Sequence, residues 1–256
     1  MAKRMSLVVL LAVGAVTALS LRGSIFSTQT QAQTMGGTKP QSRPVAFEKG
    51  QKWTSSFPDD KEFASRGKNP YFLLEPGYSQ VFEGKEGGKK VALTITVLDQ
   101  TEVVDGVETR VVEERETTDG DISEVSRNFI ALSKRTNSVF YFGEDSTEYK
   151  SGKVTGHSGS WKAGANGAKP GMLIPGTILL GARFQQEIAP GIAMDRSEIV
   201  NMDNTVQTLA GTFLHCVTMQ DSSPDEPGVK QAKVYAPGVG LVRDESLLLM
   251  KYGYPK

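Results

Sequence analysis

The fold is decided by residues 89–125, "KKVALTITVLDQTEVVDGVETRVVEERETTDGDISEV". From Val91 to Val97, apolar residues alternate with small or polar ones, which is the period of a β-strand with one buried face. Asp105-Gly106 follows this run, and Asp-Gly suits a type I′ turn because both central residues need a positive φ. Asp119-Gly120 repeats the signal. The stretch therefore predicts three consecutive antiparallel strands joined by tight hairpin turns.

The same pattern extends on both sides of this stretch. Gly87-Gly88 and Ser151-Gly152 are further two-residue turn signals, and no amphipathic helix of convincing length lies between them. The Gly/Pro-rich residues 159–191 are expected to cross one end of the sheet. Extended segments are expected at residues 182–189, 195–201, 211–219, 229–236 and 239–250. We expect ten to twelve strands in an all-β domain, an antiparallel meander that forms a half-barrel, a barrel or a two-sheet sandwich.

The N-terminus has the order of a secretory signal. Basic residues at positions 3 and 4 precede an apolar run over residues 5–21, and Thr30 and Ala32 are small residues at the −3 and −1 positions of a cleavage site. We predict a signal-peptide helix over residues 1–32 and export to the periplasm or the medium. The alternative is a retained anchor, because a predominantly apolar run of 17 residues is at the short edge of a membrane span.

Two further segments follow this signal. Residues 33–68 are predicted to be a flexible leader that docks through its aromatic residues, and residues 69–256 to be the β domain. Lys3, Arg4 and Arg22 leave with the signal, so 29 − 3 = 26 basic residues remain against 29 acidic ones, a charge of −3. Such a balance gives no broad attraction to nucleic acid. No later apolar run is long enough for a membrane span in the mature chain.

The only cysteine, Cys216, directly follows His215 in "GTFLHCVTMQ", residues 211–220. A single cysteine allows no internal disulfide. On a regular strand, neighbouring side chains point to opposite faces, so His215 is not expected to serve Cys216 as a base. We predict that Cys216 is a buried strand residue and that the chain has no catalytic residues. The alternative is a secreted hydrolase that uses Cys216 with the distant His157, or an acidic pair.

The sequence predicts no metal site and no cofactor. The two histidines are 58 positions apart and give no ligand spacing with the cysteine. Carboxylates cluster at residues 113–116 ("EERE"), 119–121 ("DGD") and 143–145 ("GED"). We interpret these clusters as solvated turns beside hairpins, while a calcium site remains the alternative.

Aromatic residues concentrate in "NSVFYFGEDSTEY", residues 137–149. In a strand, Phe140 and Phe142 lie on one face and Tyr141 on the other. A run that is apolar on both faces indicates a central strand or one wall of a ligand cavity. The candidate ligand-binding residues are therefore Phe140, Phe142, Tyr149 and Trp161.

Several stretches resemble an uncharacterised family of secreted bacterial β-rich proteins. They are "NPYFLLEPG", "VFYFGEDSTEY", "GSWKAGANGAKPGM" and the C-terminal "YAPGVGLVRDE", and the resemblance covers roughly residues 69–250. The last stretch is similar to the closing strands of periplasmic half-barrel and lipoprotein-like barrel proteins. The resemblance implies a half-barrel and no particular reaction. Unlike those lipoproteins, this chain has no cysteine near its N-terminus to carry a lipid.

Together these observations favour a non-catalytic exported β-domain. It would bind an apolar or amphiphilic ligand, or a protein partner in the cell envelope, within a concave sheet. Besides the hydrolase, the second alternative is a structural or assembly factor of the envelope.

Overall fold

The computed structural model describes residues 53–57 and 62–255, so the predicted signal peptide lies outside the described residues. All of its named elements are strands, as the all-β prediction requires. Several of the short strands have no clear signal in the sequence. The strands are β1 (Phe63–Ala64), β2 (Gly67–Asn69), β3 (Phe72–Leu74), β4 (Ser79–Glu86), β5 (Lys89–Val104), β6 (Val107–Thr118), β7 (Asp121–Ser133), β8 (Val139–Lys150), β9 (Lys153–Gly156), β10 (Trp161–Lys162), β11 (Lys169–Ile174), β12 (Arg183–Gln185), β13 (Glu187–Ile188), β14 (Arg196–Thr208), β15 (Gly211–Ser222), β16 (Gln231–Ala236), β17 (Gly240–Asp244) and β18 (Leu247–Gly253).

The four predicted turns are confirmed. Asp105-Gly106 joins β5 to β6, and Asp119-Gly120 joins β6 to β7, with positive φ at both residues of each turn. Gly87-Gly88 and Ser151-Gly152 have the same geometry between β4 and β5 and between β8 and β9. Each turn fixes its own hairpin because the twist of this turn type matches that of the flanking strands.

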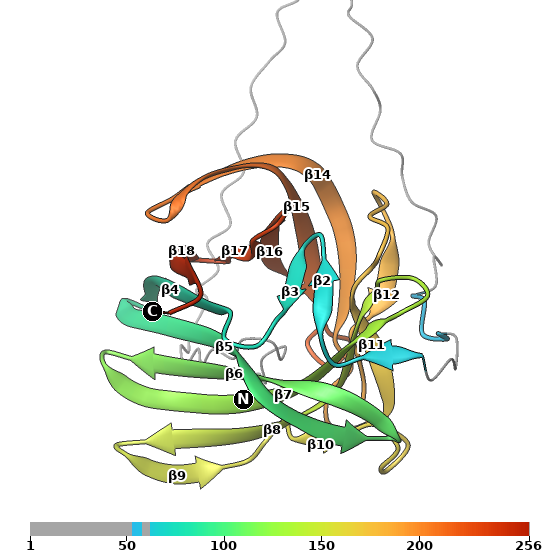
Figure 1. Cartoon of the computed structure of the whole chain (residues 1–256). Helices are drawn as coiled ribbons and strands as arrows, with labels where there is room; N and C mark the ends of the chain where they lie inside the picture. Colours follow the sequence, from blue (N-terminus) through green and yellow to red (C-terminus); the bar gives the residue numbers. More distant parts are fainter. Residues whose placement is uncertain (1–52, 58–61, 256) are drawn as a thin grey trace, which may run out of the picture.

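The strands form one large antiparallel sheet that curls into a nearly closed barrel (Figure 1). Its order is β12-β14-β15-β16-β17-β18-β4-β5-β6-β7-β8-β11-β13. The first and last strands in this order, β12 and β13, are consecutive in the chain. Residues 183–188, which we call the closure segment, therefore pair with β14 through one half and with β11 through the other.

The Gly/Pro-rich residues 159–191 do not cross one end of the sheet, contrary to the prediction. They supply β10 and β11, which pair with β8 and were not predicted. The strands β12 and β13, which complete the barrel, lie in the segment that was predicted to be extended over 182–189. Gly171 on β11 permits this arrangement, because a Cβ atom there would lie 2.2 Å from the backbone oxygen of Gln186. Glycine therefore serves close packing of strands here as well as turns.

The hairpin of β2 and β3 closes one end of the barrel. The Asn69 side-chain amide donates to the backbone oxygens of Asn137 and Pro175, at 2.8 and 3.1 Å. Gly238 N donates to the backbone oxygen of Pro70, at 2.7 Å. These bonds join the hairpin to three turns at the same end of the sheet.

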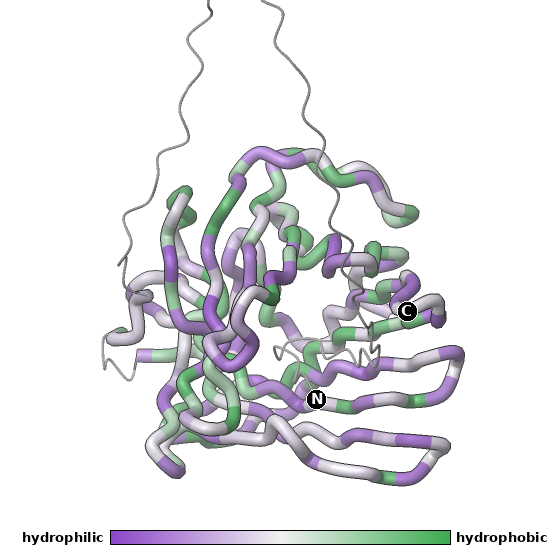
Figure 2. The backbone as a smooth tube through the Cα atoms, turned by 180° about the vertical axis from the view of Figure 1, so that it is seen from behind, coloured by the Kyte–Doolittle hydropathy of each residue, from purple (hydrophilic) through white to green (hydrophobic). Residues whose placement is uncertain are grey.

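The described part of the predicted leader lies against the barrel. Thr54 forms a parallel bridge with Phe184 on the edge of β12, and β1 pairs with β7. The Phe57 and Phe63 rings pack edge-on against Phe140. Hydrophobic and hydrophilic residues are interspersed along the strands (Figure 2), as one expects where a sheet is covered on one face and solvated on the other.

Candidate functional site

Cys216 is fully buried on β15, as predicted, but the strand around it is not regular. Asn204 pairs with Cys216 and Val206 with Phe213, so one strand carries extra residues, and His215 has a φ of 54°. This bulge overturns the expected alternation: Phe213 and Cys216 are both buried, whereas Leu214 and His215 are both exposed. Burial raises the pKa of the Cys216 thiol, which disfavours the reactive thiolate.

Neither histidine offers Cys216 a catalytic partner. Nδ1 of His215 lies 2.8 Å from the Asp203 carboxylate, in a pair that is about four-fifths exposed. His157 instead contacts the backbone oxygen of Ser146, at 2.9 Å from its Nδ1. The hydrolase alternative based on the thiol therefore gains no support from this geometry.

The four candidate aromatic residues do not form one site. Phe140 and Phe142 lie on the same face, as predicted, and both pack against the ring of Phe63. Trp161 is buried on the other side of β8, edge-on to Tyr141 at 5.4 Å between ring centroids. Tyr149 lies further along β8, opposite Val154 of β9. Phe140 and Phe142 thus hold the described leader residues onto the barrel.

The interior of the barrel contains a large group of buried carboxylates. We call them the acidic interior: Glu114, Glu116, Glu124, Glu144, Glu187, Asp195, Asp221 and Asp244. The solvated-turn interpretation is therefore wrong for Glu114, Glu116 and Glu144, although Asp119 and Asp145 are exposed. Glu114 and Glu116 continue the alternation of β6, so their side chains follow its buried face into the barrel. Glu144 follows an irregularity in the pairing of β8 with β7, between Tyr141 and Gly143.

Lys233 on β16 is the buried cation that faces this group. Its Nζ lies 3.2 Å from the Asp221 carboxylate, and both side chains are at least 97% buried. Burial lowers the pKa of Lys233, but the charges of Asp221 and Asp244 more than compensate and raise it above its ordinary value. Lys233 therefore stays charged and balances part of the interior charge.

Three of the other interior carboxyl groups, Glu114, Glu124 and Glu187, have raised pKa values. Burial, reinforced by Glu144 and Glu116, raises the pKa of Glu124 to about 8, although a hydrogen bond from Ser146 opposes the shift. Burial also raises the pKa of Glu114 and of Glu187 well above the ordinary value. Neutral carboxylic acids therefore make much of this interior compatible with a folded barrel at neutral pH.

The chemistry of the acidic interior is limited by its burial. Glu187 and Asp195 lie close enough to interact electrostatically, but both are buried, so substrate cannot reach them in this state. Within the described part of the chain, no three His, Cys, Asp or Glu side chains are grouped to hold a metal ion.

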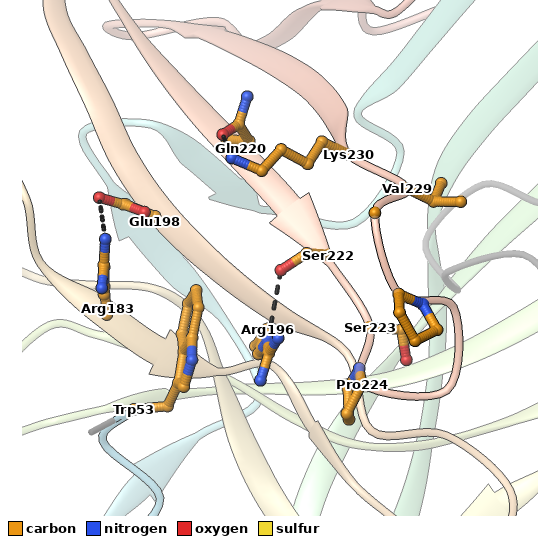
Figure 3. Close-up of a pocket in the computed structure, with 12 residues that line it drawn as sticks. Trp53, Arg183, Arg196, Glu198, Gln220, Ser222, Ser223, Pro224, Val229 and Lys230 are labelled. Atoms are coloured by element: carbon orange, nitrogen blue, oxygen red, sulfur yellow. Dashed lines mark hydrogen bonds and ion pairs between the residues drawn. The ribbon is translucent and has the colours of Figure 1, made fainter. Parts of the chain in front are cut away.

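An open cleft of about 320 Å³ lies on the outer face of β12, β14 and β15 and under the loop from Ser223 to Lys230 (Figure 3). Its charged lining residues are Arg183, Arg196, Lys230 and Glu198. Three cations against one carboxylate give the cleft a net positive charge, opposite to that of the interior.

Cross-strand pairing arranges the polar groups of the cleft in two rows. Arg183, Glu198 and Gln220 are opposite one another on the three strands, and Arg196 and Ser222 form the next row. Arg183 Nη2 lies 3.0 Å from Glu198 Oε1, whereas Arg196 Nε donates to Ser222 Oγ at 3.3 Å. The Glu198 carboxylate thus neutralises Arg183, whereas the hydrogen-bond partner of Arg196 is a neutral hydroxyl.

Trp53 fixes the two arginines. Its ring lies between them in Figure 3, with the guanidinium carbons of Arg196 and Arg183 at 4.6 and 5.6 Å from the ring centroid. Lys230 Nζ donates to Gln220 Oε1 at 2.9 Å. Cation–π contacts reduce the motion of long side chains, so Arg196 is positioned before any ligand arrives.

Sequence reasoning missed the cleft altogether. Its residues come from segments 53, 183–198 and 220–230, and each arginine by itself reads as an exposed strand residue. The available signal was the alternation in "DRSE", residues 195–198. Asp195 and Ser197 are buried, whereas Arg196 and Glu198 face outward into the cleft.

No protein-family model, no curated protein and no solved structure matches the chain. The resemblance to secreted half-barrel proteins therefore stays a prediction. Among residues 53–57 and 62–255 there is no helix that is long and apolar enough to cross a membrane.

Proposed function

We propose that this protein is a non-catalytic binding domain that takes a small amphiphilic anion in the cleft beside Trp53. The observation that carries the proposal is the convergence of Arg196 and Lys230 on a cleft of ligand size, next to Ser222 and Gln220. Ligand pockets typically have volumes of roughly 300–1,000 Å³, so about 320 Å³ suits a small molecule.

The lining assigns a role to each part of the ligand. Arg196 and Lys230 would hold a carboxylate, phosphate or sulfate group by charge-assisted hydrogen bonds. Pro224, Pro227 and Val229 supply apolar surface for the rest of the molecule. The predicted signal peptide over residues 1–32 adds export to the proposal, which cell fractionation of the full chain would test.

Phenyl phosphate and inorganic phosphate are suitable probes. We expect millimolar phenyl phosphate to raise the melting temperature of the protein and inorganic phosphate to raise it less, because only the former has an apolar group. Binding must weaken with added salt, since it depends on exposed charges.

Matched variants make the test specific. Arg196→Gln should abolish the shift, whereas Arg127→Gln, which removes an exposed arginine of β7 outside the cleft, should keep it. If neither probe raises the melting temperature, or if both variants respond equally, the cleft is not the binding site.

A further inference from the structure

The closure segment joins the two ends of the sheet through short stretches of backbone pairing. Its halves pair with β14 over three residues and with β11 over two. Between them, Gln186 N and Glu187 N both donate to one acceptor, the backbone oxygen of Asp195, at 2.7 and 3.0 Å. Loss of that shared acceptor would release the centre of the segment.

Glu187 lies at this centre, and its side chain points into the acidic interior. It is fully buried, and neither carboxyl oxygen has a hydrogen-bond partner of good geometry among the described residues. The Trp161 indole is close enough to favour the charged form of this carboxyl, but its N–H is not aligned for a regular hydrogen bond. An ionised Glu187 would therefore be poorly stabilised in this position.

The groups that face Glu187 come from every side of the interior. Asp195 and Glu144 oppose its ionisation, and Lys233, which is already paired with Asp221, favours it. On the neighbouring β11, Pro170 is opposite Glu187 and carries no charge, and Lys169, opposite Ile188, is exposed. Two acids against one shared cation leave the neutral form of Glu187 as the compatible one.

We propose that the closure segment is a pH-sensitive latch: while Glu187 keeps its proton the barrel stays closed, and loss of that proton breaks the bonds of Gln186 N and Glu187 N to Asp195 and opens the barrel between β11 and β14. The closure segment begins at Arg183, which lines the cleft, so its detachment would also alter one side of the cleft. The proposal does not depend on the cleft binding a ligand.

The sign of the linkage follows from the raised pKa of Glu187. In the open state, this carboxyl is hydrated and ionises near its ordinary pKa of 4.5. The open population should then rise about tenfold per pH unit above that value, until the pH reaches the pKa of the closed state, because opening releases one proton. Below pH 4.5 the latch should be insensitive to pH.

Amide hydrogen exchange of the full chain between pH 5 and 8 tests the latch, with rates corrected for the intrinsic effect of pH. We expect the corrected exchange rate of amides 186–189 to rise about tenfold per pH unit, and we expect the amides of the β6–β7 hairpin to exchange more slowly. Glu187→Gln, a neutral isostere, should remove the slope, and Glu83→Gln, at an exposed site on β4, should keep it.

Three results would overturn the latch. The corrected rate of amides 186–189 can be independent of pH, it can equal that of the β6–β7 hairpin at every pH, or its slope can persist in Glu187→Gln. The second result would assign the linkage to global unfolding. The wild-type profile decides the matter even if the glutamine variant does not fold.

Discussion

Where β14 begins and β15 ends, buried carboxyl groups alternate with residues that line the cleft. Asp195 and Asp221 point into the barrel, whereas Arg196 and Ser222, the next residue of each strand segment, point into the cleft. Outside, the charges remain hydrated and contribute little to stability. Inside, each charge must be paired or neutralised by a proton. The same alternation thus produces a binding surface on one side and a stability problem on the other.

The largest expected effect comes from removing the interior cation. Lys233→Met leaves the buried Asp221 carboxylate without its partner, and we expect a loss of about 3–5 kcal/mol in the free energy of unfolding at pH 7. The matched control is Lys230→Met on the cleft side, where we expect a change within about 0.5 kcal/mol. Urea unfolding measures both, and equal losses would show that the two faces do not differ.

The pH dependence of stability is the second test. The pKa of Glu124 is about 8 in the folded protein and 4.5 when unfolded, so the folded state binds the proton more tightly. The resulting stability is complete below pH 4.5 and is lost as the pH rises toward 8. The slope is about 1.4 kcal/mol per pH unit for each such group.

Glu124→Gln should therefore flatten the decline in the free energy of unfolding between pH 5 and 8. Urea titrations at four pH values in that range measure the slope, and Glu83→Gln serves as the exposed control. Parallel profiles in the wild type and in Glu124→Gln would mean that Glu124 titrates normally in the folded barrel.

The smallest effect is expected at Cys216, a neutral buried residue on the strand that also carries Asp221. Cys216→Ser adds a poorly satisfied hydroxyl and should cost about 1–3 kcal/mol. Cys216→Ala should cost less, because it leaves only a small void. Melting temperatures compare the two variants, and unchanged melting of both would contradict the packing role of this thiol.

Local turn chemistry made most of the fold predictable. Asp105-Gly106 and Asp119-Gly120 each fixed one hairpin, because the dipeptide and its flanking alternation specify turn type and register together. The β-rich class and the antiparallel order of β4–β8 followed from such local signals. The Gly/Pro-rich residues 159–191 were misjudged, since their strands form only by pairing with residues far away in the chain.

The burial of the interior carboxyl groups and the bulge in β15 were not predictable in the same way. Glu114 and Glu124 look like surface residues in the sequence, because their burial depends on a barrel closed by β11 and the closure segment more than 40 residues later. The bulge at His215 likewise has no local turn signal, and it places Cys216 on the face of Phe213, where the alternation predicted His215.

By itself, the sequence determined the period of the strands, the places of the hairpin turns and the candidate for export at the N-terminus. These are local properties: each depends on a few neighbouring residues and on backbone sterics. The tertiary structure decided which alternating face became the interior, which carboxyl groups keep a proton, and which arginines meet in a cleft. Those outcomes depend on the closing of the barrel, which brings distant strands together and removes water from one face.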